Sequence, residues 1–201
     1  MVPLLAGALA VSIAATNLSF LRSRTSVSSS FSTWLSKFFS SDSFYEEAKV
    51  LQIYDGDTIL VEFKGRREKV RFIGIDAPES SESAKARRDA ARLGVTLQEL
   101  FVQGVESTKY LKTLMQRGDE INLEFDTQER DKYGRMLAYI HTLGKKSINE
   151  EMLRAGYASL MIITPDNRYQ QKFLNQCETA KKQKRGLWKE ERPFLTCFIW
   201  S

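Results

Sequence analysis

The sequence predicts an α+β protein, in which a five-stranded β-barrel carries about three to four helices and is preceded by an N-terminal hydrophobic helix. Three observations predict it. Short segments with alternating apolar and polar residues indicate strands. Helical stretches are inserted after the third strand and follow the fifth. Strands and helices do not alternate as βαβ units, which argues against a doubly wound parallel sheet.

The chain begins with a hydrophobic segment, residues 1–21, followed at once by Arg22 and Arg24. About 20 such residues can span a bilayer. Because the basic residues follow the apolar run, we interpret the segment first as a membrane anchor. A cleaved export signal and a mitochondrial presequence are alternatives. We therefore expect membrane contact through residues 1–21 and a membrane-anchored or exported protein, with a mitochondrial location as the alternative.

Composition divides the rest of the chain. Residues 22–43 contain ten serines and are interpreted as a linker, because such a composition cannot bury enough apolar surface to fold alone. We expect a globular domain over residues 44–192 and a C-terminal tail over residues 193–201. Residues 1–41 hold three basic and no acidic residues, so only +2 of the net charge of +5 belongs to the remainder. Global charge is thus a weak indication of a nucleic-acid partner.

The first predicted elements are strands. Residues 49–63 read as two short strands joined by a turn at Asp55 and Gly56, which is the strongest hairpin signal in the chain. Residues 68–75, "EKVRFIGI", read as the third strand.

Two helices are expected next, over residues 83–94 and 97–118. The second has apolar residues at helical spacing and Gly118 as its expected C-cap. The remaining predicted elements are strands at 120–125 and 135–142, a short helix at 148–156 and a final helix near 168–185. Five short strands with helices in these places suit a small closed or partly open barrel of the OB type.

Cysteine and histidine offer little chemistry here. Cys177 and Cys197 have no metal-like spacing and form no zinc or redox motif. His141 is the single histidine, and we interpret it as a surface or edge-strand residue. Any catalysis must therefore use carboxylates, arginines and a hard metal.

Three separated stretches place acids and bases unusually: "DGDT" with Asp57, "RFIGIDAPE" with Arg71, Asp76 and Glu79, and "ERDKYGR" with Arg135. Each has an ordinary structural explanation taken singly. Aspartates favour turns, a glutamate suits a helix N-terminus, and an arginine next to buried strand residues can point to solvent.

Together, these residues indicate phosphate chemistry. Asp57 and Asp76 can supply two oxygen ligands to calcium, with the Ala77 carbonyl as a third. Calcium takes about six to eight oxygens at flexible angles. Arginine binds phosphate in a bidentate manner and stays charged, which suits Arg71 and Arg135 to a pentacoordinate transition state. One carboxylate, Glu79, is then free to activate water.

These motifs, with "INEEMLRAGYA" and "KKQKRGLW", resemble the staphylococcal nuclease (thermonuclease) family over residues 47–190. The resemblance implies a Ca²⁺-dependent phosphodiesterase on an OB-fold barrel that cuts DNA and RNA, mainly single-stranded, and leaves 3′-phosphates. It implies metal ligands at Asp57, Asp76 and Ala77. It implies catalytic roles for Arg71, Arg135 and Glu79, and contacts from Lys132 and Tyr133 to a terminal phosphate. We expect a monomer.

The sequence departs from the family in two places. The stretch after Glu79 is longer and carries basic residues, which either contact substrate phosphates or form a solvated helix face: Lys85, Arg87, Arg88 and Arg92. Residues 159–167, "SLMIITPDN", stand where the family has tyrosines for the base. The alternative function is a catalytically inactive module that binds nucleic acid or protein. Joint retention of ligands, base and arginines favours the enzyme.

Overall fold

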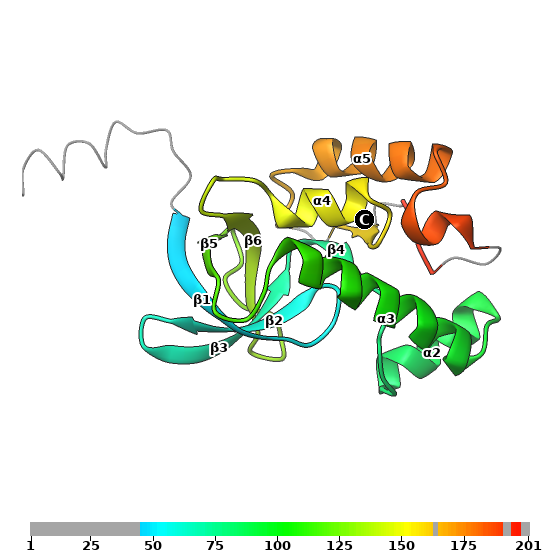
Figure 1. Cartoon of the computed structure of the whole chain (residues 1–201), viewed down its shortest axis with the longest axis horizontal. Helices are drawn as coiled ribbons and strands as arrows, with labels where there is room; N and C mark the ends of the chain where they lie inside the picture. The colour runs from blue at the N-terminus through cyan, green and yellow to red at the C-terminus, as the bar shows by residue number, and fades with distance from the viewer. Residues whose placement is uncertain (1–44, 163–164, 191–193, 198–201) are drawn as a thin grey trace, which may run out of the picture. The chain divides into compact units, whose positions relative to one another are not determined.

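The computed structural model describes residues 45–162, 165–190 and 194–197 of the chain (Figure 1). The expected hydrophobic segment 1–21 and linker 22–43 lie outside these residues. Within the described ranges, no helix combines the length and the apolar character needed to cross a membrane.

Five strands close into the expected barrel, in the order β1-β2-β3-β6-β5. Their bounds are β1 Tyr45–Ile53, β2 Thr58–Phe63, β3 Arg66–Phe72, β5 Glu120–Glu124 and β6 Met136–Thr142. The β3–β6 pair is parallel and the other neighbours are antiparallel. The α+β class and the five-stranded barrel are therefore confirmed.

The turn between β1 and β2 lies at the predicted place. The Asp57 N–H donates to the Asp55 carboxylate at 3.0 Å, and the Tyr54 N–H donates to the Thr58 carbonyl at 3.0 Å. An aspartate that bonds its own backbone two residues on stabilises such a turn. The turn leaves Asp57 at the start of β2.

The strand predicted over residues 68–75 is divided in the structure. β3 ends at Phe72, and a separate strand, β4 (Gly74–Asp76), pairs with β7 (Ser159–Met161), which the sequence did not indicate. Gly74 has a φ of +81°, and a Cβ there would lie 2.7 Å from the Phe173 ring. This glycine lets the chain turn away from the barrel, so Asp76 ends a second, two-stranded sheet.

The helices of the described chain are α2 Ala84–Leu93, α3 Leu97–Leu114, α4 Ile148–Arg154, α5 Gln170–Lys182 and the short 3-10 helix η1 Gly186–Lys189. Figure 1 shows α4 and α5 on one side of the barrel and the long α3 running from the barrel toward α2. Ser83 caps α2, and Thr96 with Glu99 forms a capping box on α3.

The predicted C-cap of α3 is wrong. The helix ends at Leu114 with Met115 as its cap, and Gly118 lies in the following turn. There the Gly118 N–H donates to the Val50 carbonyl of β1 at 2.8 Å, and the Asp119 carboxylate accepts from Gln116 N–H at 2.8 Å. Contacts with the barrel thus decide where the helix stops.

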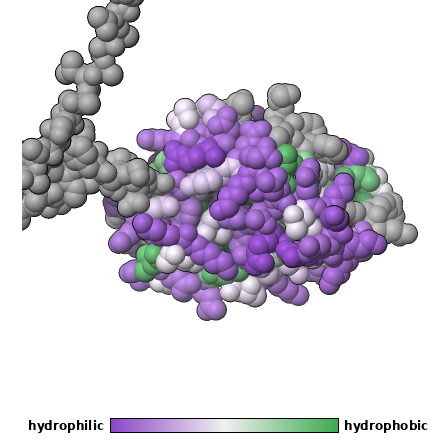
Figure 2. Space-filling model, turned by 90° about the horizontal axis from the view of Figure 1, so that it is seen from above, coloured by the Kyte–Doolittle hydropathy of each residue, from purple (hydrophilic) through white to green (hydrophobic). Residues whose placement is uncertain are grey.

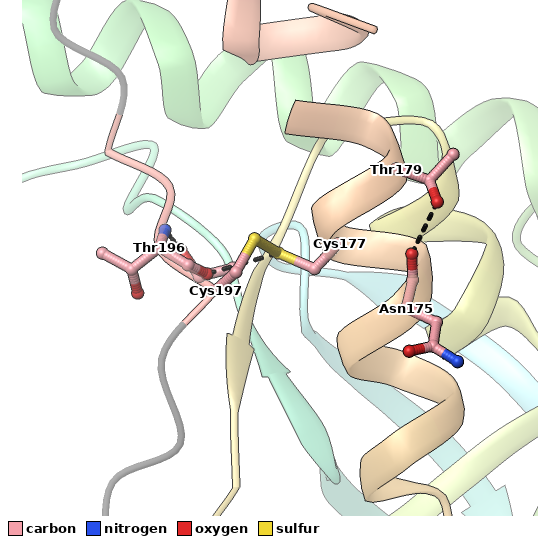
Figure 3. Close-up of a disulfide and its surroundings, with 6 residues drawn as sticks. Asn175, Cys177, Thr179, Thr196 and Cys197 are labelled. Atoms are coloured by element: carbon pink, nitrogen blue, oxygen red, sulfur yellow. Dashed lines mark hydrogen bonds between the residues drawn. A yellow bond between two sulfur atoms is a disulfide. The ribbon is translucent and has the colours of Figure 1, made fainter. Parts of the chain in front are cut away.

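A single hydrophobic core joins the barrel to the helices, and it includes Phe194 and Leu195 from the segment expected as a tail. Figure 2 shows the face above α4 and α5, where hydrophilic residues cover most of the surface and hydrophobic ones are scattered. Cys177 of α5 and Cys197 form a disulfide, which fixes the C-terminal segment to the helix (Figure 3).

His141 is buried, so its interpretation as a surface or edge-strand residue is wrong. β6 lies between β3 and β5 in the barrel. The Nε2 atom of His141 lies 2.7 Å from the Glu124 carboxylate, which also accepts from Arg168 and from the Tyr169 hydroxyl. Burial of the acid requires these partners.

Candidate active site

A cavity of about 790 Å³ opens where the barrel meets β4 and α2. Seven of the eight residues singled out from the sequence form part of its wall: Asp57, Arg71, Asp76, Glu79, Lys132, Tyr133 and Arg135. The eighth, Ala77, is buried directly behind them. The structure therefore gathers three stretches that are far apart in the chain.

Asp57 is held rigidly at the start of β2 and is 5% exposed. Its carboxylate accepts from the Thr58 hydroxyl at 2.8 Å and from the Ala77 N–H at 2.6 Å. The second bond ties the turn after β1 to the segment after β4. Asp57 and the Ala77 backbone thus become neighbours across 20 residues of chain.

Arg71 lies on β3, opposite Thr58 of β2, and its side chain contacts both Asp57 and Asp76. Its Nη2 lies 2.8 Å from Asp76 Oδ1 and 3.2 Å from Asp57 Oδ2, and its Nη1 donates to the Ile75 carbonyl at 2.7 Å. The side chain is only 11% exposed. It therefore does not point to solvent, and several acceptors fix its planar fork.

Burial and neighbouring charges separate the pKa values of the three aspartates. Burial alone would raise the pKa of Asp57, but Arg71 and further hydrogen bonds outweigh it and lower that pKa below its ordinary value. Burial raises the pKa of Asp76 despite nearby cations. Burial and the adjacent Asp57 charge raise the pKa of Asp55 to about 8. The site thus favours the ionised form of Asp57 over the ionised forms of Asp55 and Asp76.

Glu79 follows β4 and the Pro78 turn, at the edge of the same cavity. One carboxylate oxygen accepts from the Ser83 hydroxyl at 3.3 Å, and the other lies 3.3 Å from Lys85 Nζ. The Glu79 backbone rests on α3 at Gly104, where an added Cβ would come 2.2 Å from the Glu79 carbonyl oxygen. The close approach of α3 therefore fixes the position of the backbone segment that carries Glu79.

Lys85 is a member of the site whose position the sequence left open between a phosphate contact and a solvated helix face. From α2 its Nζ lies 3.4 Å from Asp76 Oδ1, 3.3 Å from Glu79 Oε1 and 3.2 Å from Asp89 Oδ2. It also donates to the Ala77 carbonyl at 3.5 Å. The spacing to Asp89, four residues along the helix, was the one available signal.

Arg135 lines the cavity from the loop that precedes β6. Its Nε donates to the Asp131 carboxylate at 2.7 Å, and together with backbone N–H groups this bond lowers the pKa of Asp131 although burial opposes it. Lys132 and Tyr133 belong to the same loop, and Tyr133 is 72% exposed. This loop thus presents cations and an aromatic ring without burying them.

The cavity has a methionine in the segment where the resemblance implies tyrosines. Met161, at the end of β7, has its sulfur 3.8 Å from Arg71 Nη2 and lines the cavity. Tyr54 also lines it, with the Lys69 ammonium 4.4 Å from the ring centroid. The cavity therefore offers a different aromatic surface from the one that the resemblance implies.

The donor set suits a hard cation. Asp57, Asp76 and the Ala77 carbonyl supply oxygen atoms only, which calcium prefers. Burial disfavours the charged forms of Asp55 and Asp76 and raises their pKa values, and a divalent cation beside them would favour those charged forms. Among the described residues, no three acidic, histidine or cysteine side chains form a complete metal cage. Water and substrate oxygens would have to complete the coordination.

Comparisons with known proteins give the chain its family. The family model described as staphylococcal nuclease homologue matches residues 69–190. The thermonuclease of Staphylococcus hyicus is 32% identical over 140 residues, covering 70% of this chain and 74% of that protein. Endonuclease YhcR of Bacillus subtilis (strain 168) is 33% identical over 153 residues, covering 74% of this chain but 12% of that protein. The thermonuclease of Staphylococcus intermedius is 29% identical over 143 residues, covering 71% and 76%.

The family match spans more than half of the chain and includes β3, β4 and the loop with Arg135. The chain belongs to the family of staphylococcal nuclease homologues.

Proposed function

We propose that this protein is a calcium-dependent endonuclease that hydrolyses phosphodiester bonds in DNA and RNA, mainly single-stranded, and leaves 3′-phosphates. The observation that carries the proposal is the buried Arg71 fork, which joins Asp57 to Asp76 in a cavity that Glu79 and Arg135 also line. Buried charges are costly and give no packing advantage. The names of the relatives, thermonuclease and endonuclease, support the same activity.

In this proposal Asp57, Asp76 and the Ala77 carbonyl hold calcium. Bound calcium supplies positive charge beside the scissile phosphate and its attacking water. The hydrogen bonds from Thr58 and Ala77 orient the Asp57 carboxylate for this task. Such supporting contacts to ligand groups commonly tune metal affinity.

Glu79 is the proposed general base. It takes a proton from a water molecule whose oxygen attacks phosphorus on the side opposite the leaving 5′-oxygen. A new P–O bond forms as the P–O5′ bond breaks. The 5′-oxygen takes up a proton and leaves as a hydroxyl, and the phosphate stays on the 3′ side. Ser83 and Lys85 hold the Glu79 carboxylate at the cavity edge.

The two arginines stabilise charge that develops on the phosphate oxygens. Arg71 is fixed by its acceptors, so little reorganisation is needed when the transition state forms. Arg135 reaches the phosphate from the loop that precedes β6, and Lys132 with Tyr133 contacts a terminal phosphate from the same loop. Positive side chains from β3 and from this loop suit a chain of phosphates that crosses the cavity.

The test is single-turnover cleavage of a short single-stranded DNA in calcium, beside DNA binding at matched salt. Glu79→Gln should lower the rate about 10²–10⁴-fold with little change in affinity. Glu82→Gln is the matched control, because this exposed neighbour pairs with Arg87 outside the cavity, and it should cleave normally. Arg135→Lys should also slow cleavage, because it keeps charge but loses the planar fork.

The competing function is a module that binds without cleaving. If the protein is such a module, Glu79→Gln should bind and cleave DNA like wild type. Chelation of metal should then leave any residual cleavage unchanged. Asp57→Ala tests the metal independently of turnover. This variant should lose calcium binding in a calorimetric titration, and an unchanged titration would reject the assigned ligand.

A further inference from the structure

The proposed mechanism explains only one of the contacts that Lys85 makes, the one with Glu79. Three of the four oxygens around its ammonium belong to groups with other assigned tasks: Asp76 and the Ala77 carbonyl as metal ligands, and Glu79 as base. All lie within 3.5 Å of Nζ. The ammonium therefore contacts two of the three groups assigned to the metal, Asp76 and the Ala77 carbonyl, and also the proposed base.

The rest of the molecule fixes Lys85 there. Asp89, one turn further along α2, lies 3.2 Å from Nζ and is itself bound by Arg92. The Phe194 ring lies beneath, with its centroid 5.2 Å from Nζ. The Phe194 N–H donates to Gln103 of α3 at 2.8 Å, which anchors the ring. An aromatic face and an i,i+4 carboxylate both favour a cation at this place.

The side chain is nevertheless accessible from the cavity. It is 32% exposed and lines the cavity, and α2 presents it on a long flexible stem. A phosphodiester entering the cavity offers this ammonium an anionic acceptor of the same charge as a carboxylate, so Lys85 can release an Asp76 or Ala77 oxygen and still keep a charged partner. Lys85 can therefore exchange carboxylate partners for a phosphate without a change in the backbone.

Building on the proposed function, we propose that Lys85 is a tethered cation that competes with calcium for Asp76 and the Ala77 carbonyl until nucleic acid draws its ammonium onto a phosphate. Two cations cannot share these oxygens without strong repulsion. Calcium alone therefore binds weakly, and calcium with nucleic acid binds more tightly. By linkage, calcium strengthens nucleic-acid binding by the same factor. The arrangement would restrain the site until its substrate is present.

The experiment measures calcium affinity by calorimetry on the 201-residue chain, without and with an uncleaved phosphorothioate tetranucleotide. Lys85→Met keeps the length of the stem and removes its charge. Without the oligonucleotide, this variant should bind calcium roughly tenfold more tightly than wild type, within the usual range of such couplings. The oligonucleotide should strengthen calcium binding to wild type about tenfold, and to Lys85→Met by less than about threefold.

Lys109→Gln is the control for total charge. It removes a positive charge from the exposed face of the neighbouring helix α3, and should titrate like wild type. Lys85→Met leaves the half-buried Asp89 with Arg92 but without the Lys85 ammonium, and can lose stability for that reason. The double variant Lys85→Met with Asp89→Asn keeps the local charge balance, and should also bind calcium more tightly than wild type.

Calcium affinity of both Lys85 variants at or below the wild-type value would overturn the inference. Asp57→Ala, titrated in parallel, separates this failure from a failure of the proposed function. Loss of calcium binding in Asp57→Ala with no gain in the Lys85 variants would refute only the competing cation. Unchanged titrations in every variant would refute the calcium site as well.

Discussion

At the scale of single residues, Arg71 and Arg135 have the same assigned chemistry in different surroundings. Arg71 is largely buried between Asp57 and Asp76, whereas Arg135 is partly exposed and forms an ion pair with Asp131. Removing the cation from a buried cluster leaves uncompensated charge, and removing it from an exposed pair does not. The two arginines should therefore separate catalysis from stability.

We predict that Arg71→Met lowers the free energy of unfolding by about 3–5 kcal/mol in metal-free protein at pH 7. Arg135→Met should lower it by less than about 1 kcal/mol, because solvent screens its ion pair. Urea denaturation followed by circular dichroism measures both values. Similar losses in the two variants would mean that Arg71 is not the cation that balances Asp57 and Asp76.

The sequence predicted which polar residues form the site, but it did not predict that Arg71 is buried. Alternation with buried Val70 and Phe72 places Arg71 on the outer face of the barrel, and an outer face normally meets solvent. Here β4 and β7 cover that face, and Asp76 and Met161 come from those strands. The burial of Arg71 therefore depends on a second sheet that local patterning did not reveal.

At the scale of elements, α3 supports the segment that carries Glu79. The absence of a side chain at Gly104 lets the helix approach the backbone of Glu79 and Ser80. Gly104→Ala would place a methyl group 2.2 Å from a carbonyl oxygen that cannot rotate away. We predict a loss of about 1–3 kcal/mol in unfolding free energy and a fall in the cleavage rate as Glu79 shifts.

Val102→Ala is the control for this prediction, because Val102 is half exposed on the same helix. It should change stability by less than about 0.5 kcal/mol and leave cleavage unchanged. A crystal structure of Gly104→Ala would show whether the Glu79 segment has moved. Normal cleavage by a folded Gly104→Ala variant would contradict a supporting role for α3.

Glu151 of α4 accepts a hydrogen bond from the Tyr110 hydroxyl of α3, so the stability of this contact between helices depends on pH. Burial alone would raise the pKa of Glu151, but Arg154 and the Tyr110 hydroxyl outweigh it and lower the pKa below its ordinary 4.5. A lowered pKa stabilises the fold above pH 4.5, and the contribution is lost as pH falls through the folded-state value.

Glu151→Gln should therefore be less stable than wild type at pH 7, by about 1–2 kcal/mol for a carboxylate hydrogen-bonded to Arg154 and Tyr110. The difference should shrink as the pH is lowered below 4.5. Urea titrations at several pH values measure it. A difference that stays constant down to acid unfolding would exclude ionised Glu151 as its source.

Segments with a strong local pattern could be predicted from the sequence, whereas short strands that depend on pairing with a distant segment could not. The helices near 83–94 and 148–156 and the strand near 120–125 lie close to their predicted places, because their patterns are local. β7 has three residues, and its partner β4 lies more than 80 positions earlier in the chain. Such short strands exist only through pairing, so tertiary contacts decide them.

At the scale of the whole molecule, the C-terminal segment connects back to the site. The Leu160 N–H of β7 donates to the Thr196 carbonyl at 2.9 Å, and Ser159 of the same strand pairs with Asp76. Phe194 lies beneath Lys85. The segment thus borders two members of the site, and the disulfide between Cys177 and Cys197 fixes it.

The disulfide also bears on where the protein works. Disulfides persist in oxidising compartments and are rare in reducing ones. We propose, on this ground, that the domain is exported or faces an oxidising compartment. Calcium is abundant outside cells, which suits the proposed cofactor. The sequence alone did not show whether Cys177 and Cys197 form a disulfide, because their pairing depends on how the chain folds after α5.

Reduction of the disulfide is the last test, and it links stability to the site. The bond closes a loop across 20 positions, and a loop of this size stabilises a fold by about 2–4 kcal/mol. We predict that dithiothreitol lowers the melting temperature and slows calcium-dependent cleavage, because Phe194 and Thr196 lose their fixed contacts with Lys85 and β7. The double variant Cys177→Ser with Cys197→Ser should show both effects without reductant and no further change with it. A reduced wild-type protein that melts and cleaves as before would show that the C-terminal segment is held by its hydrophobic contacts alone.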